Sequence, residues 1–326
     1  MTDRILSIPH TVDIPDDGLL IGNGDISCSL YQKPGMLVWR LGKGDVWDRR
    51  LDYHLDPKPA HIKEMIKGIR DEKWRCGPYG GPVEALAGTD NPERMREICQ
   101  GCPPSHIMRA YPCPKPVGEL TLHYPPDLPG FSLTQELDVA RDRLRVECAW
   151  EGGVRLTASA WIARDRNVLF LDARLEGWGP QTAVNEAYLA PVYFTLLRWA
   201  DPDVKDYGAA FIAKYRIIFD PYAGCGGDPL PPPTVEELDG GIPYIEQRFQ
   251  AEPTYPEGIF CGMTATLNAY APVRLPTVPS LAGLRWQPAA DRTGEELHMA
   301  LAVETGGSRP ELQGRLSRTL AFDRPA

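Results

Sequence analysis

The clearest pattern in this sequence is an alternation of apolar and polar positions through the middle of the chain. Apolar residues occupy every second position on either side of a Glu-Gly-Gly break, in two series: Leu144, Val146, Cys148 and Trp150, then Val154, Leu156, Ala158, Ala160 and Ile162. A two-residue period is that of a strand with one buried face. Strands separated by tight turns at about 8–12-residue spacing indicate an antiparallel meander, and hence a sandwich or a barrel.

The same period recurs toward both ends of the chain. Ile26, Cys28 and Leu30 predict a strand, and the turn residues Gln32-Lys33-Pro34-Gly35 lead to a return strand that starts at Met36. Further strands are predicted at 120–124, 133–139, 168–175, 244–249, 258–271 and 296–305. The pattern therefore predicts a mainly β protein made of antiparallel strands.

Helical spacing interrupts the strands in a few places. Residues 60–72 place isoleucine and methionine side chains on one helical face, and residues 91–100 predict a second short helix. We interpret the region from about 58 to 116 as an insertion in a β-sandwich domain that spans residues 1–305. A short helix is also expected within 185–200, an ordered loop over the Pro- and Gly-rich residues 220–243, and a linker helix within 306–326.

Composition narrows the classes of function. The formal net charge of −9 argues against a nucleic-acid partner, because phosphate binding requires concentrated Lys and Arg. No run of apolar residues approaches the about 20 that a membrane helix needs. The first residues lack the basic and apolar regions of a secretory signal, so a cytoplasmic location is expected.

A polar loop near the beginning of the chain is the main candidate for chemistry. Lys43, Asp45, Trp47, Asp48 and Arg49 lie in one segment between glycines and a second arginine. An indole for the apolar face of a sugar, with charged groups that bind hydroxyls, is a mixture typical of a carbohydrate site. The alternative is a structural loop closed by Asp–Arg pairs, with Trp47 in the core.

The glycines that precede this loop do not predict a nucleotide site. Gly22-Asn23-Gly24 matches the start of a dinucleotide-binding motif, but Ser27 occupies the place of its third glycine, and a strand rather than a helix follows. A tight turn before a strand is the simpler interpretation, and the sequence indicates no cofactor.

The cysteines form a weak candidate metal cluster. Cys99 and Cys102 have metal-ligand spacing, but Cys76 and Cys113 are isolated rather than a second close pair. Buried or free thiols are therefore the favoured interpretation. Cys28, Cys148 and Cys261 fall at inward strand positions and are expected in the core.

The segment 21–50, with Gly22-Asn23-Gly24, a hairpin and a loop ending in Trp47, resembles the start of the N-terminal domains of six-hairpin glycosidases. Glycoside hydrolase families 65 and 95 are the nearest groups. Asp25 and Ser27 depart from the family 95 pattern. Gly118-Glu119-Leu120, the meander over 131–176 and a closing strand with a trailing helix are similar to the same domain.

This resemblance implies a large antiparallel β super-sandwich of the galactose mutarotase-like type, followed by an (α/α)₆ barrel that carries the catalytic acid and base. We expect that barrel to be absent from this chain, so no catalytic residue is assigned here. The domain is expected to complete a carbohydrate pocket, with a C-terminal barrel in cis or trans as its partner. The implied substrate-binding residues are Asn23, Asp25, Lys43, Asp45, Trp47, Asp48 and Arg49.

Two other functions stay open from the sequence. One is an independent carbohydrate-binding or structural β-domain. The other is a self-sufficient sugar epimerase of the mutarotase-like class, which requires a histidine and a carboxylate on one face of the sandwich. His123 and His298 are the strand-borne candidates for that histidine.

Overall fold

The fold is described from a computed structural model. It describes residues 5–8, 18–48, 63, 113–124, 129–177, 192–199, 231–249, 258–276, 278, 281–288 and 296–321. The chain divides into two compact units. The first comprises Met1–Trp47, Pro114–Ala200 and Pro231–Ala326, and the second comprises Asp48–Cys113 and Asp201–Leu230. Of the second unit only residues 48, 63 and 113 are described, so the account below concerns the first unit.

Two large antiparallel sheets make up the first unit, as the sequence predicted. Sheet A has nine strands in the order β1-β8-β9-β10-β11-β18-β15-β14-β13. Their bounds are β1 Ile5–Ile8, β8 Ser132–Asp138, β9 Arg143–Ala149, β10 Arg155–Ile162, β11 Val168–Glu176, β13 Thr234–Glu237, β14 Pro243–Arg248, β15 Phe260–Leu267 and β18 Glu296–Gly306. Sheet B has seven strands in the order β16-β17-β12-β7-β4-β3-β2. These are β2 Leu19–Gly22, β3 Ile26–Lys33, β4 Met36–Lys43, β7 Gly118–His123, β12 Tyr193–Trp199, β16 Tyr270–Arg274 and β17 Leu281–Pro288. The short strands β5 (Trp47–Asp48) and β6 (Cys113–Pro114) form a separate pair.

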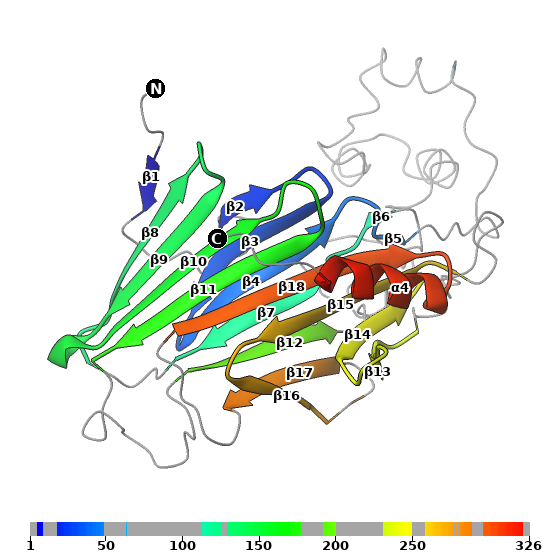
Figure 1. Ribbon diagram of the computed structural model, residues 1–326. Coiled ribbons are helices and arrows are strands. Elements are labelled where there is room, and N and C mark those ends of the chain that lie inside the picture. The colour runs from blue at the N-terminus through cyan, green and yellow to red at the C-terminus, as the bar shows by residue number, and fades with distance from the viewer. Residues whose placement is uncertain are drawn as a thin grey trace, which may run out of the picture. The chain divides into compact units, whose positions relative to one another are not determined.

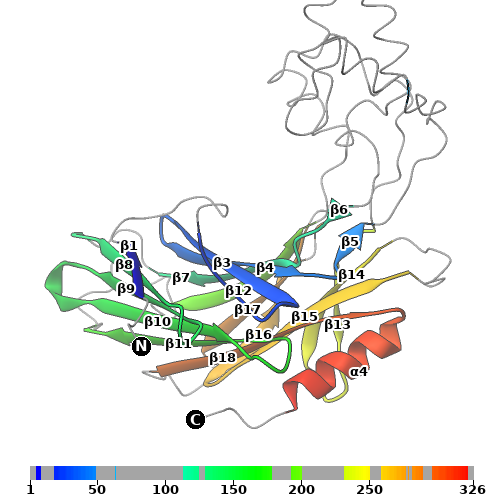
Figure 2. The ribbon, with the colours of Figure 1, turned by 90° about the horizontal axis from the view of Figure 1, so that it is seen from above.

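The two sheets lie face to face as layers of a sandwich, which Figure 2 shows from above. One row of fully buried side chains crosses sheet B from strand to strand: Leu30, Trp39, Leu120, Leu196 and Leu284. In sheet A the series predicted from the alternation, from Leu144 to Ile162, is buried at every second position. The core is thus formed by the inward-facing period-2 positions of both sheets.

Tight turns join the strands where the sequence predicted them. Gly35 adopts a φ of +71° between β3 and β4, a left-handed conformation that glycine adopts without steric cost. The break between β9 and β10 is a 3₁₀ turn at Glu151–Gly153, and the five residues that follow β10 connect it to β11. Antiparallel neighbours in sequence are therefore neighbours in space along β8 to β11.

A single described helix, α4 (Arg309–Leu320), packs on the outer face of sheet A over β15 and β18 (Figure 1). Its N-cap is Ser308, whose side chain accepts a hydrogen bond from the backbone N–H of Glu311. Leu312 and Leu316 are fully buried against the sheet. Gly262 on β15 permits this approach, because a Cβ at that position would lie 2.9 Å from Leu312 Cδ2.

The structure corrects two of the sequence expectations and leaves others outside its range. The part of 185–200 that is described forms the strand β12 instead of a helix. Within the expected loop at 220–243, residues 234–237 form β13 and β14 begins at Pro243. The helices expected at 60–72 and 91–100 lie outside the described residues, apart from the single helical residue 63. The domain boundaries predicted from the sequence stay a prediction.

Candidate functional site

Lys43 is the centre of the polar loop that the sequence singled out. It is the last residue of β4, and its side chain is only 4% exposed. Its ammonium donates hydrogen bonds to both carboxylate oxygens of Asp25, at 3.0 and 3.1 Å, and to Asp45 Oδ1 at 2.8 Å. The two carboxylates are about half exposed, so the network joins a buried cation to the protein surface.

The electrostatics of this network favour the charged forms. Burial works against the charge on Lys43, but the hydrogen bonds and charges of Asp45 and Asp25 outweigh it and raise the pKa of Lys43. For Asp45, burial also opposes the charge, whereas the hydrogen bonds from Lys43 and Thr305 lower the pKa of the carboxyl overall. Both groups are therefore ionised near neutral pH, and Lys43 is a fixed cation rather than a proton donor or nucleophile.

Asn23 has a structural role in the turn between β2 and β3. Its side-chain oxygen accepts hydrogen bonds from the backbone N–H groups of Asp25 and Ile26, at 3.0 and 2.9 Å. Its amide nitrogen donates to the carbonyls of Ala163 and Arg166 in the β10–β11 turn. Asn23 thus ties one edge of sheet B to sheet A and fixes the backbone that presents Asp25.

Trp47 lies at the exposed end of the loop. Its side chain is among the exposed large apolar groups, at 36%, and its Nε1 donates a hydrogen bond of 2.8 Å to the carbonyl of Gly44. The alternative that placed this indole in the core is therefore wrong. Asp48 is the last residue of β5, but its side chain and Arg49 lie outside the described residues, so the structure does not test either assignment.

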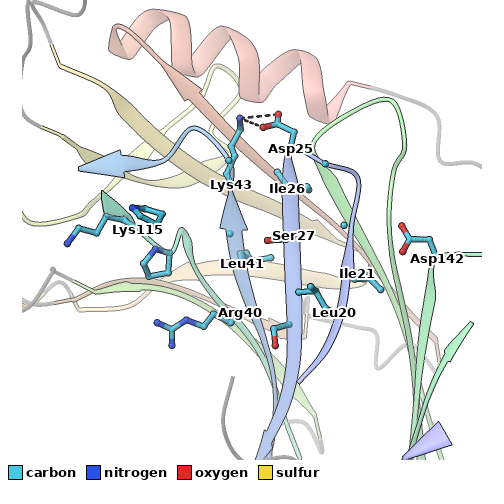
Figure 3. A pocket seen from close by; sticks show the side chains of 17 residues that line it. Leu20, Ile21, Asp25, Ile26, Ser27, Arg40, Leu41, Lys43, Lys115 and Asp142 are labelled. Atoms are coloured by element: carbon cyan, nitrogen blue, oxygen red, sulfur yellow. Dashed lines mark hydrogen bonds and ion pairs between the residues drawn. The ribbon is translucent and has the colours of Figure 1, made fainter. Parts of the chain in front are cut away.

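A pocket of about 880 Å³ adjoins this network (Figure 3). It extends over β2, β3 and β4, and Lys43, Gly44 and Asp25 lie at one end of it. Arg40 and Lys115 line the side opposite Asp142, as Figure 3 shows. The base of the pocket lies close to the backbone of β3 and β4, because two small residues, Ser27 and Gly42, pair with each other there. The pocket therefore combines apolar walls with fixed donors and acceptors.

Three residues of this region were not predicted from the sequence. Thr305 Oγ1 donates a hydrogen bond of 2.5 Å to Asp45 Oδ2, and Asn167 Nδ2 donates to Asp25 Oδ2 at 2.8 Å. Asp142 accepts a hydrogen bond from the backbone of Gly22. No local pattern could reveal these partners, because between 120 and 260 residues separate each pair along the chain.

The two histidines considered for an epimerase have different surroundings. His123 Nε2 lies 2.8 Å from Thr195 Oγ1, and its ring stacks on Tyr193 with 4.3 Å between centroids. Burial, with the charge of Arg285, lowers the pKa of His123 to about 4. His298 Nδ1 lies 2.7 Å from Asp172 Oδ1 on the neighbouring strand of sheet A. Only His298 has a carboxylate partner among the described residues.

The cysteine predictions are tested in part. Cys28, Cys148 and Cys261 are buried free thiols, as expected. Cys76, Cys99 and Cys102 and the side chain of Cys113 lie outside the described residues. Within the described ranges no three His, Cys, Asp or Glu side chains are grouped closely enough to hold a metal ion.

The described helix is too short and too polar to cross a membrane.

Comparisons with solved structures give neighbours at low sequence identity, which include a phosphorylase and a glucoamylase. No protein-family model matches the sequence, and no curated protein matches it. The chain is similar to a protein named as a kojibiose phosphorylase from the human microbiome, at 8% identity and a TM-score of 0.43, over 97% of this chain and 36% of that one. It is also similar to a bacterial glucoamylase solved with acarbose, at 10% identity and a TM-score of 0.29, over 56% of this chain and 24% of that one. The chain spans about a third of the first protein's length, and both neighbours are carbohydrate-active enzymes.

Proposed function

We propose that this chain is a pocket-completing domain of a carbohydrate-active glycoside hydrolase, as an N-terminal super-sandwich of the family 65 and 95 type. The observation that carries the proposal is the exposed indole of Trp47, held by the Gly44 carbonyl beside the Asp25–Lys43–Asp45 network. The indole offers an apolar face for a pyranose ring, and the carboxylates offer acceptors for its hydroxyl groups.

The Asp25–Lys43–Asp45 network would position a bound sugar and would take no part in cleaving its glycosidic bond. Lys43 is held as a cation by two carboxylates, so neither proton transfer nor nucleophilic attack is assigned to it. Inverting hydrolysis needs two carboxyl groups about 6.5–9.5 Å apart with a water between them. Because Asp25 and Asp45 share one ammonium, we assign them to sugar binding and leave the catalytic pair to an (α/α)₆ barrel supplied in cis or trans.

The experiment that tests this proposal is a saccharide titration of the full chain. Tryptophan fluorescence, measured against a panel of neutral di- and trisaccharides, should report binding that Trp47→Ala weakens by about 10-fold or more. Phe131→Ala is the matched control, because Phe131 is also an exposed aromatic side chain, at 38%, away from the pocket. Equal affinities of Trp47→Ala and the wild type would count against the proposal.

A second candidate is favoured by one observation, the His298–Asp172 pair at 2.7 Å. A carboxylate that orients one ring nitrogen leaves the other available as an acid or base. A self-sufficient epimerase would therefore accelerate the anomerisation of α-glucose or α-galactose in polarimetry, and His298→Asn would abolish that rate. We expect no acceleration by the wild-type chain, and a rate that depends on His298 would replace the first proposal with this one.

A further inference from the structure

The outer face of sheet A, which is turned away from sheet B, has two halves of different character. The helix α4 covers β15 and β18, whereas no described helix lies over β8 to β11 (Figure 1). On that second half the surface is hollowed, with a volume of about 790 Å³. This hollow is separate from the pocket beside Lys43 and shares no lining residue with it.

The hollow follows from the sizes of the side chains on three neighbouring strands. On the central strand β10 the outer face carries the short side chains of Thr157 and Ser159. The longer side chains that flank them are Arg145 and Glu147 on β9 and Asp172 and Arg174 on β11. We call the depression formed by these six residues the β10 trough. Its walls are about 10 Å apart, which is twice the spacing between strands and wide enough for one pyranose ring.

The charges around the β10 trough form an alternating arrangement. Arg145 and Asp172 stand on opposite sides of Ser159, and Glu147 and Arg174 stand on opposite sides of Thr157. Each wall thus carries one cation and one anion. A ligand with a charge of one sign would meet one attracting and one repelling group on each wall, so its charge would gain little net stabilisation. A neutral polyhydroxylated ligand can donate to the carboxylates and accept from the guanidinium groups at the same time.

Contacts outside the trough hold most of its charged side chains. Asp172 pairs with His298 at 2.7 Å, Glu147 with Arg155 at 3.2 Å, and Arg174 with Glu176 at 3.0 Å. These partners orient three of the four charged side chains in the two walls and leave further donor and acceptor positions on each group.

Ser159 and Arg145 are two polar groups of the trough that lie outside these ion pairs. The buried hydroxyl of Ser159 has no hydrogen-bond partner among the described residues. None of the ion pairs that the described residues form on this face includes Arg145. A ligand hydroxyl group in the trough would accept a hydrogen bond from the Arg145 guanidinium.

An aromatic pair lies beyond one end of the trough, outside its lining residues, and the guanidinium of Arg143 lies over the Trp161 ring, 4.4 Å from its centroid. Trp161 follows Ser159 on the same face of β10, and its ring stacks on Phe170 of β11 with 5.3 Å between centroids. An aromatic edge next to charged hydrogen-bonding groups is the combination that fits the two faces of a sugar ring. We propose that the β10 trough is a second binding site, which takes one unit of a neutral saccharide and is independent of Trp47.

The test is isothermal titration calorimetry on the full chain with maltose, cellobiose, lactose and xylobiose as neutral probes and with glucuronate and glucosamine as charged probes. The trough variant Arg145→Met/Arg174→Met keeps the side-chain stems and removes both cations. A second variant, Ser159→Phe, fills the trough without changing charge. Arg248→Met, an exposed position on β14 of the same sheet, is the matched control.

At least one neutral probe should bind, with an affinity that falls about 10-fold or more in both trough variants and stays unchanged in Arg248→Met and Trp47→Ala. Binding that Trp47→Ala removes and the trough variants leave intact would overturn this inference while the proposed function stands. Absence of binding by every neutral probe, or tighter binding of a charged probe, would overturn it as well. Circular dichroism of both trough variants verifies that they fold, so a loss of binding reports on the trough.

Discussion

An ion pair between Glu246 and Arg309 helps to hold the first turn of α4 against sheet A, and its two side chains differ in burial. We therefore expect the two single substitutions to destabilise the protein by different amounts. The side chain of Glu246 on β14 is 3% exposed, whereas that of Arg309, the first residue of α4, is 48% exposed. Glu246 accepts hydrogen bonds from Arg309 Nε at 2.8 Å and Nη2 at 2.5 Å, and from the hydroxyl of Tyr244 at 2.7 Å. Removing one partner or the other should therefore have unequal effects.

The two single variants are Glu246→Gln and Arg309→Met. In Glu246→Gln the guanidinium can turn to water, so the loss is that of charge-assisted hydrogen bonds, about 1–2 kcal/mol. In Arg309→Met the carboxylate stays buried, and the Tyr244 hydroxyl is the one close donor left to it among the described residues, so we expect a loss of about 3 kcal/mol. The double variant should be no less stable than Arg309→Met alone, because it leaves no buried charge behind.

Urea unfolding followed by circular dichroism measures these free energies, with a common slope for all variants. The decisive quantity is the order of the two single variants together with the coupling in the double-mutant cycle. If Glu246→Gln is as destabilising as Arg309→Met, or if the two effects add, then burial of the carboxylate does not control this contact and the reasoning is refuted.

Three further predictions concern other parts of the described structure. Gly262→Val should lower the free energy of unfolding by about 1–3 kcal/mol, because the added side chain overlaps Leu312; an unchanged melting temperature would contradict this close approach. Lys43→Met should destabilise the protein by about 1–2 kcal/mol at pH 7, since both partner carboxylates are half exposed and can hydrate. That difference should shrink in acid. The lowered pKa of Asp45 contributes stability that is fully present above the ordinary carboxyl pKa of 3.8 and is lost as pH falls through the lower folded pKa, so a constant difference from pH 7 to pH 3 would disprove this prediction. For His123, whose pKa is lowered to about 4, the unfolded chain takes up a proton below about 6.5 and the folded chain does not, so stability should fall by up to about 3 kcal/mol between pH 6.5 and pH 4. His123→Gln should remove this part of the pH dependence in urea unfolding, and an unaltered slope would exclude His123 as its source.

The strands that the sequence predicted best are those with one polar face. From β8 to β10 most outer positions carry charged or hydroxyl side chains, with Trp161 as an exception, and the inner positions other than Gln135 carry apolar ones, so the period is visible without any structure. The strand β12 has no such alternation, because Phe194, Thr195 and Leu196 are buried in succession. A strand covered on both faces looks like a short apolar run, which periodicity alone does not distinguish from a helix.

Proline and glycine residues made two other strands, β13 and β17, hard to predict from the sequence. β13 follows directly on the Pro231-Pro232-Pro233 run, and the sequence expectation extended that loop across it. β17 contains Gly283 and ends at Pro288, so its residues carry weak strand propensity. In both cases pairing with neighbouring strands decides the conformation, and that pairing depends on residues far away in the chain.

For the candidate site, the sequence indicated the residue types but not their arrangement. Lys43 and Asp45 are two positions apart, so their contact follows from local spacing. The hydrogen bond from Thr305 to Asp45 depends on the pairing of distant strands, and only the folded structure reveals it. The β10 trough was not predicted, because it requires the register between three strands rather than the composition of any one of them.

The position of β18 bears on how the chain is synthesised. It is the last strand that the structure describes, yet it lies inside sheet A and pairs with β11 on one side and β15 on the other. Until β18 has been synthesised, β11 has an unpaired edge from residue 176 onward and β15 has one from residue 267 onward, and such edges invite association with other nascent chains. The nine-stranded sheet therefore completes only once β18 has left the ribosome, and until then the edges of both its parts are open to association.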